Sequence, residues 1–404
     1  NNYIYDIEAF PNFFLCTLKR VNEDIWYNFE ISERKNDSLI LRHFLLNEIK
    51  EELPVFLFYT SGTTAEPKGV LYTNKMLFWN SLNTTMQLGI SNQDTTLSIL
   101  PPYHTSGWNI FVTPLLHNGG KILMLSKFDP DKILYFLQQH KVTLMMALPT
   151  ILQMISKCEG FSKADFPHLR FIISGGESIS KEIIELWRNE KLVDIRPGYG
   201  LTEAGPSITS LHQDFSISKP NSIGKPNFYV DLDIVDPKGN SLKCNQLGEL
   251  RIKGEIVTPG YWNNSIATAD KIKNSWFHTG DLAYRDEDGF YYLKGRIDDM
   301  YICGGENIFP QEIENVLNQH PAILRSLVIP MKDNVWGKKG IAFLETKQEI
   351  TNEDILEFLK DKLARFKHPK EFLFFKDFPL TGFGKISRKD LKRMYQHQKH
   401  KSNY

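Results

Sequence analysis

The chain has 404 residues and a mass of 46.8 kDa, which is the length of two or three domains. Lysine plus arginine and aspartate plus glutamate each number 48, so the formal charge is zero. This balance argues against electrostatic binding of the whole protein to nucleic acid or to an anionic membrane. The four cysteines are scattered without a CxxC pair, which indicates neither a disulfide framework nor a thiolate zinc site. We therefore expect a cytoplasmic, mixed α/β enzyme without a membrane span and without a nucleic-acid partner.

Residues 1–50 predict a short β-rich segment. Aromatic and β-branched residues, separated by turn residues, indicate strands at 3–5, 13–18 and 25–31. Residues 38–50 then predict a helix, because Ser38 can serve as N-cap before an apolar stripe of Leu41, Phe44 and Leu45.

The rest of the chain predicts a large domain and a small one. Strands and helices alternate over residues 51–296, which is typical of helix-covered sheets; the clearest are a helix at 129–140 and strands at 142–147 and 169–174. Residues 297–395 predict a small α+β domain, with a helix at 311–318, a strand at 324–330 and a charged helix at 352–362. The polar tail, 396–404, is expected to fray.

A loop rich in hydroxyl groups follows the apolar strand 55–58. It reads Thr60-Ser61-Gly62-Thr63-Thr64-Ala65-Glu66-Pro67-Lys68-Gly69. Such a loop can offer backbone N–H groups, hydroxyl donors and one mobile positive charge to a polyphosphate. It is not a Walker A loop, since no Ser or Thr follows the lysine. The alternative is an ordinary polar hairpin turn.

This loop and the strings after it resemble the superfamily of AMP-forming acyl- and aryl-CoA synthetases, which also includes luciferases and nonribosomal adenylation domains. The resemblance extends from about Leu53 to about Met394. The strings occur in the family order: Pro102-Tyr103-His104-Thr105-Ser106-Gly107, Ser174-Gly175-Gly176-Glu177, Gly198-Tyr199-Gly200-Leu201-Thr202-Glu203, His278-Thr279-Gly280-Asp281, Lys294-Gly295-Arg296-Ile297-Asp298-Asp299, Gly304-Gly305-Glu306-Asn307 and Gly384-Lys385-Ile386.

The resemblance implies a two-step reaction with ATP, Mg²⁺ and coenzyme A. A carboxylate attacks the α-phosphate of ATP and gives an acyl-adenylate and pyrophosphate, and a thiol then displaces AMP. Carboxylate and phosphate are both anionic, so the barrier is largely electrostatic and requires cations placed in advance. Either coenzyme A or the thiol arm of a carrier protein can serve as the acceptor.

The family places its nucleotide contacts at matching positions of this sequence. Glu203 matches the magnesium-binding carboxylate and Thr202 a phosphate contact, while Asp281 and Arg296 match the residues that bind the ribose hydroxyls. Tyr199 matches the aromatic residue that stacks on adenine, although a tyrosine between two glycines can also be a core aromatic at a turn. The remaining expected nucleotide contacts are Thr60, Ser61, Gly62, Thr63, Thr64, Lys68, Gly176, Glu177, Ser178 and Gly200.

The C-terminal domain is expected to supply the catalytic lysine and a hinge. Lys385 matches the family lysine that bridges the substrate carboxylate and a phosphate oxygen. Asp298 matches the pivot about which this domain rotates between the two steps. This rotation brings the glycine loop, which consists of Gly304, Gly305 and Glu306, to the coenzyme A tunnel. The expected acyl-pocket residues are His104, Trp108 and Gly198.

The sequence departs from the family at two places. Ala65 stands where glycine is common, and a Cβ costs about 1 kcal/mol if that position needs positive φ. Only about 50 residues precede the phosphate loop, where family members carry a piece the size of a small domain. Residues 3–47, with Tyr5-Asp6-Ile7-Glu8-Ala9-Phe10-Pro11-Asn12, instead resemble the opening of the exonuclease domain of family B DNA polymerases. An exposed strand with alternating carboxylates is the alternative, and we expect a fusion without nuclease activity.

Three functions follow from these patterns. The first is an ATP-dependent CoA ligase acting on a fatty or related hydrophobic acid. The second is a catalytically impaired, truncated fusion that at most binds nucleotide. The third is a polymerase-derived nucleic-acid module, which the neutral charge and the missing partner carboxylates disfavour.

Overall fold

The computed structural model describes residues 27–31, 41–45, 50–60, 67–125, 128–177, 179–219, 221–333, 336–379 and 386–402. The chain divides into two units, residues 1–53 and 54–404. In the first unit, β1 (Tyr27–Ile31) pairs antiparallel with β2 (Leu41–Leu45).

Strand β1 lies within the predicted strand at 25–31, whereas the helix predicted at 38–50 is wrong. Its apolar residues fit a helical stripe, but the backbone of residues 41–45 forms a strand. All five residues of β2 pair with β1, and this partner replaces a short helix whose nucleation would be unfavourable. The strands predicted at 3–5 and 13–18, with Asp6 and Glu8, lie outside the described residues.

The second unit contains a 12-stranded mixed sheet in the order β12-β13-β15-β16-β11-β10-β9-β8-β7-β5-β6, with β14 paired to β15. Its parallel part consists of β5 (Thr95–Ser98), β6 (Lys121–Met124), β7 (Leu144–Met146), β8 (Phe171–Ser174) and β9 (Asp194–Tyr199). Its antiparallel part consists of β10 (Thr209–Ser210), β11 (Ser222–Pro226), β12 (Asp231–Val235), β13 (Gly248–Lys253), β14 (Ile272–Lys273), β15 (Trp276–Arg285) and β16 (Tyr291–Arg296).

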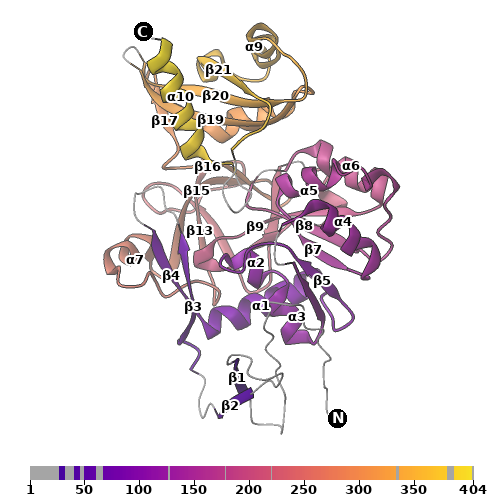
Figure 1. Ribbon diagram of the computed structural model, residues 1–404. Helices are drawn as coiled ribbons and strands as arrows, with labels where there is room; N and C mark the ends of the chain where they lie inside the picture. The colour runs from indigo at the N-terminus through magenta and orange to yellow at the C-terminus, as the bar shows by residue number, and fades with distance from the viewer. Residues whose placement is uncertain are drawn as a thin grey trace. The chain divides into compact units, whose positions relative to one another are not determined.

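Two groups of helices flank the parallel strands (Figure 1). They are α1 (Asn74–Leu88), α2 (Thr105–Asn109) and α3 (Val112–Asn118), and α4 (Pro130–Gln139), α5 (Pro149–Ser156) and α6 (Lys181–Lys191). The helix predicted at 129–140 is confirmed as α4. It begins here because Asp129 is the N-cap, whose side chain accepts hydrogen bonds from the backbone N–H groups of Asp131 and Lys132, and because Pro130 suits the first helical position. A further helix, α7 (Ser265–Lys271), precedes β14.

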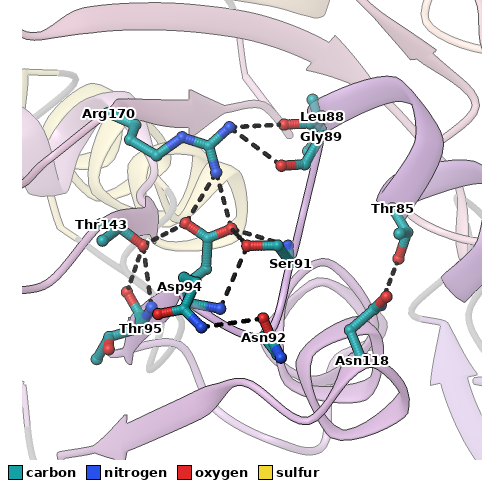
Figure 2. Close-up of polar contacts among 11 residues, drawn as sticks. Thr85, Leu88, Gly89, Ser91, Asn92, Asp94, Thr95, Asn118, Thr143 and Arg170 are labelled. Atoms are coloured by element: carbon teal, nitrogen blue, oxygen red, sulfur yellow. Dashed lines mark hydrogen bonds and ion pairs between the residues drawn. The ribbon is translucent and has the colours of Figure 1, made fainter.

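A polar network connects four of these elements where the parallel strands β5, β7 and β8 begin (Figure 2). The Arg170 guanidinium, one residue before β8, donates to both carboxylate oxygens of Asp94 at 2.8 Å and to the Leu88 and Gly89 carbonyls at the end of α1. Thr143, just before β7, donates to Asp94 at 2.7 Å. One buried carboxylate therefore connects the ends of α1, β7 and β8 to β5.

Residues beyond β16 form a separate five-stranded sheet in the order β18-β17-β20-β19, with β21 paired to β20. Its strands are β17 (Tyr301–Cys303), β18 (Glu306–Ile308), β19 (Ile323–Asp333), β20 (Gly337–Thr346) and β21 (Glu371–Phe375). They pack with α8 (Pro310–Leu317), α9 (Asn352–Lys360) and α10 (Arg388–Ser402). The predicted α/β fold with a smaller α+β domain is thus present, and α8, β19 and α9 occupy the predicted positions.

Helix α10 extends to Ser402, beyond the point where the sequence predicts fraying. Buried Leu391 and Tyr395 anchor the helix, and the Tyr395 hydroxyl donates to Glu371 at 2.9 Å. Adding residues to an anchored helix costs little, which explains the extension. No helix among the described residues is both long and apolar enough to cross a membrane.

Candidate functional site

Three expected nucleotide contacts meet where β9, β15 and β16 come together. Asp281 on β15 stands opposite Arg296 on β16, and an Arg296 Nη1 hydrogen bond of 2.9 Å joins the two side chains. The Tyr199 hydroxyl, at the end of β9, donates to the other Asp281 oxygen at 2.5 Å. Tyr199 and Asp281 are only 8% and 6% exposed, so the Asp281 carboxylate is held from two sides.

Burial sets the protonation of this cluster. It raises the pKa of Asp281 above its ordinary value of 3.8, against the opposing effect of the Arg296 charge. Burial, followed by the charge of Asp281, also raises the pKa of Tyr199 well above 10.0. The phenol therefore remains a neutral donor throughout the physiological pH range.

Glu203 is placed by a tight turn after β9. Residues 202–204 form a 3₁₀ turn, and the Leu201 N–H donates to the Gly205 carbonyl. A Cβ at Gly200 would lie 2.3 Å from the Pro206 backbone, so the turn closes only with glycine at this position. The Tyr261 hydroxyl donates to Glu203 Oε1 at 2.8 Å.

The expected phosphate loop begins and ends on a hairpin. Strands β3 (Pro54–Thr60) and β4 (Lys68–Thr73) are antiparallel, and Thr60 stands opposite Lys68 at the mouth of the loop. The Lys68 ammonium lies 5.5 Å from the centre of the Tyr261 ring, the same ring whose hydroxyl donates to Glu203. Ser61, Gly62, Thr63 and Thr64, with the departure at Ala65, lie outside the described residues.

Two polar residues that sequence reasoning missed support these groups. Glu249 on β13 accepts the Gly280 N–H at 3.0 Å and lies 2.9 Å from His278 Nδ1, so it holds the turn before Asp281. Tyr261 contacts both Glu203 and Lys68. Strand β13 alternates charged Glu249, Arg251 and Lys253 with apolar Leu250 and Ile252, so no local signal distinguishes Glu249 from its neighbours.

A large cleft of about 1260 Å³ gathers residues from both domains of the second unit. Thr60, Gly176, Glu177, Thr202 and Arg296 line it, as the sequence predicts for nucleotide contacts. Ile386 and Arg388 line it from the C-terminal domain. Ser178 and Lys385 lie outside the described residues, but Lys385 immediately precedes Ile386.

A smaller cavity of about 130 Å³ lies beside this cleft. His104 and Gly198, both expected at the acyl pocket, line it together with apolar Met146 and hydroxyl-bearing Ser207. Trp108 instead packs edge-on against Phe56 on β3, with ring centres 6.1 Å apart.

The expected hinge and glycine loop lie close together along the chain. Arg296 Nη2 lies 3.8 Å from Asp298 Oδ2, directly after β16. Gly304 and Gly305 have φ values of +59° and +89° and turn the chain from β17 into β18, ahead of Glu306. This left-handed pair requires glycine, which explains its occurrence between two short strands.

The residues present suit a magnesium ion carried by ATP. No cluster of three or more His, Cys, Asp or Glu side chains that could hold a metal occurs in the part of the chain that the structure describes. Mg²⁺ in nucleotide sites needs only one or two carboxylates, because phosphate oxygens and water complete its shell. Glu203, with one oxygen bonded to Tyr261 and a second oxygen to offer, fits this requirement.

The sequence matches two family profiles in succession: AMP-binding enzyme over residues 17–262 and AMP-binding enzyme C-terminal domain over residues 312–385. The chain belongs to the AMP-binding enzyme family. Among curated relatives, feruloyl-CoA synthase of Amycolatopsis sp is 33% identical over 341 residues, which are 84% of this chain and 69% of that protein. A 2-succinylbenzoate–CoA ligase of Bacillus cereus (strain Q1) is 35% identical over 354 residues, 87% of this chain and 73% of that protein.

Solved structures of family members share the fold. ATP-bound MatB from Rhodopseudomonas palustris superposes with a TM-score of 0.79 at 29% identity, covering 86% of this chain and 69% of that one. O-succinylbenzoate coenzyme A synthetase (MenE) from Bacillus subtilis in complex with AMP gives 0.76 at 30% identity, covering 87% and 72%. As a family member, this chain is an AMP-forming acyl-CoA ligase that uses ATP, Mg²⁺ and coenzyme A.

Proposed function

We propose that this ligase activates a compact, ring-sized carboxylic acid, whereas the sequence suggested a fatty or related hydrophobic acid of unspecified chain length. The observation that carries the proposal is the 130 Å³ cavity between His104 and Ser207. An apolar cavity of about 150 Å³ accommodates a single benzene ring, whereas a long acyl chain needs several times that volume. Hydroxyl groups of Ser106, Ser207 and Thr209 in the lining suit a substituted ring better than a plain alkyl chain.

The relatives support the same class of acid. Feruloyl-CoA synthase and 2-succinylbenzoate–CoA ligase both take their names from acids that carry an aromatic ring. An enzyme named as a fatty acyl-CoA synthetase, from Mycobacterium tuberculosis, is also similar, with a TM-score of 0.67 and 28% identity. The cavity volume is the observation that favours the ring acids over the fatty acids.

In the proposed first step, an oxygen of the acid attacks the α-phosphorus of ATP, and the bond to pyrophosphate breaks. Thr60 and Lys68, at the mouth of the phosphate loop, bind the departing phosphates, while Asp281 and Arg296 hold the ribose. Glu203 would hold the magnesium ion of bound Mg-ATP, which would neutralise phosphate charge. Lys385 bridges the two reacting anions, which repel each other without it.

In the proposed second step, the thiol of coenzyme A attacks the acyl carbon and AMP leaves with the electron pair of the broken C–O bond. The thiol proton passes to solvent. Gly304 and Gly305 lack side chains where the pantetheine arm must approach the reacting carbon. Cys158, Cys244 and Cys303 are free thiols, which fits the reducing cytoplasm where both ATP and coenzyme A are available.

The test is AMP release from Mg-ATP and coenzyme A with benzoic and cinnamic acids on one side and C8 to C16 alkanoic acids on the other. We expect a new acyl-CoA mass with a ring acid, and at least tenfold lower kcat/KM with palmitate. Lys385→Ala should abolish AMP release, whereas Lys389→Ala, in the same basic stretch, should not. A higher kcat/KM for palmitate than for the ring acids would overturn the proposed acid class. If a folded protein released no AMP with any of these acids, the function that remains would be nucleotide binding without catalysis.

The cavity itself can be tested by enlarging it. Met146 is buried and lines the pocket, so Met146→Ala should open room for a few additional methylene groups. We expect the ratio of kcat/KM for octanoate to that for benzoate to rise about tenfold. This ratio of kcat/KM values does not depend on how much of the variant is folded. An unchanged ratio would show that this cavity does not select the acid.

A further inference from the structure

Tyr261 lies in a segment whose backbone is bonded to the phosphate-loop hairpin. The Trp262 N–H donates to the Gly69 carbonyl at 2.7 Å, and the Leu71 N–H donates to the Gly260 carbonyl at 3.1 Å. Tyr261 also pairs with Val70 as an isolated bridge. These bonds place the Tyr261 backbone alongside β4, opposite Val70 and two residues beyond Lys68.

The Tyr261 side chain extends from this backbone toward two expected nucleotide contacts, Lys68 and Glu203. Its ring lies 5.5 Å below the Lys68 ammonium, and its hydroxyl donates to Glu203 at 2.8 Å. The residue is 6% exposed, so its position is fixed by packing. One side chain therefore contacts the cation expected at the phosphates and the carboxylate expected at the metal.

The same segment also holds the backbone of Glu203. The Thr258 N–H donates to the Glu203 carbonyl at 2.8 Å, while the Thr258 hydroxyl donates to the Leu71 carbonyl at 2.6 Å. Residues 258–261 thus contact Glu203 at its main chain and at its carboxylate. A carboxylate fixed at both ends has lost the rotamer freedom that metal binding would otherwise have to remove.

We propose that Tyr261 is a positioning residue that aims the second carboxylate oxygen of Glu203 at the magnesium ion of Mg-ATP. A phenol bonded to one carboxylate oxygen makes a charge-assisted bond and leaves the other oxygen with a defined direction. The inference rests on the proposed function in one respect, namely that Glu203 binds the magnesium ion of Mg-ATP. It concerns nucleotide binding alone, before any acid or coenzyme A is bound.

Tyr261→Phe separates the hydroxyl from the ring. The phenylalanine ring keeps its place below Lys68, so ATP affinity in EDTA should remain within about twofold of wild type. Loss of a charge-assisted bond should weaken the Mg²⁺-dependent part of ATP affinity by roughly 10-fold. Tyr261→Leu removes the ring as well and should lower ATP affinity with and without Mg²⁺.

The measurement is calorimetric titration of ATP into the full chain at a series of Mg²⁺ concentrations and in EDTA. Glu203→Gln should lose most of the Mg²⁺ effect, and Tyr261→Phe added to it should change nothing further, because the two groups act as one unit. Tyr291→Phe is the matched control, since it removes a hydroxyl bond of 3.2 Å to the Leu232 carbonyl. We expect it to bind Mg-ATP like wild type.

Three results would overturn the proposal. The first is an unchanged Mg²⁺ dependence in Tyr261→Phe. The second is an equal loss with and without Mg²⁺, which would make the hydroxyl a direct phosphate contact. The third is an additive loss in the double variant. Because no acid is present, none of these outcomes depends on which acid the enzyme uses, so a failure here is distinguishable from failure of the proposed function.

Discussion

Asp281 has two partners in the folded protein and, in the proposed complex, accepts ribose hydroxyls as well. Tyr199 and Arg296 each bond one of its oxygens, and each oxygen has a second lone pair to offer. The two partners therefore fix the carboxylate without using up its capacity as an acceptor. The ribose contact should depend on the charge of Asp281 as much as on its shape.

Asp281→Asn tests whether the ribose contact depends on the charge of Asp281, because it replaces a single oxygen atom of the carboxylate with nitrogen. The amide keeps the size of the side chain but has one acceptor oxygen and no charge, so ATP affinity should fall about 10-fold to 100-fold. Asp288→Asn, on the exposed turn between β15 and β16, is the control and should bind as wild type. Equilibrium titration of ATP measures both, and equal affinities of the two variants would exclude a role for Asp281.

Sequence reasoning found residues at motif positions and missed those that act across long separations. Gly200 and Gly304 could be predicted, because their turns impose a steric demand that only glycine meets. Tyr261 and Glu203 are 58 residues apart, and their bond exists only because β4 lies beside the segment holding Tyr261. No local pattern contains that information.

At the scale of elements, the same limit explains the error at β2. Leu41, Phe44 and Leu45 satisfy a helical period, and pairing with β1 decided the outcome. Where a capping signal is local, as at Asp129 before α4, the prediction held. The parallel strands β7 and β8 were also predictable, since a continuous apolar run reflects burial on both faces.

The network around Asp94 should contribute to holding these elements together. Burial acts to raise the pKa of Asp94, but hydrogen bonds from Arg170, Thr143 and Ser91 outweigh it and lower the pKa below 3.8. A carboxyl whose pKa is lowered by folding stabilises the protein above its unfolded pKa. That stability is lost as the pH falls through the folded value.

Arg170→Ala should therefore lower the free energy of unfolding by about 2–3 kcal/mol near neutral pH, less than for a fully buried pair because Arg170 is partly exposed. The difference from wild type should shrink below pH 3.8, as Asp94 becomes protonated. Urea denaturation at several pH values measures it. Lys132→Ala, which removes an exposed pair with Asp129, should cost less than 1 kcal/mol, and a comparable loss would contradict the assigned role.

At the scale of the whole molecule, the proposed mechanism assigns the two half-reactions to different positions of the C-terminal domain, because Lys385 would enter the cleft for one and leave it for the other. Arg388, three residues beyond Lys385, lies 3.9 Å from Asp299 and 3.7 Å from Glu314. Asp299 follows the expected hinge residue, and Glu314 is held by the Val328 N–H at 2.7 Å. Arg388 thus joins the end of the lysine segment to the hinge through Asp299 and to α8 through Glu314.

Arg388→Ala should break this connection and affect the half-reactions unequally. Without it, the lysine segment is less firmly set relative to the hinge, so acid-dependent exchange of pyrophosphate into ATP should slow about tenfold. Thioester formation from a preformed acyl-adenylate does not use Lys385 and should stay within about twofold of wild type. Arg393→Ala, which removes an exposed pair with Asp390 on the same helix, controls for general damage to α10. Equal slowing of both steps would mean that Arg388 only stabilises the domain. Loss of a connection between the lysine segment and the hinge must slow adenylation, which needs the lysine, more than thioester formation, which does not.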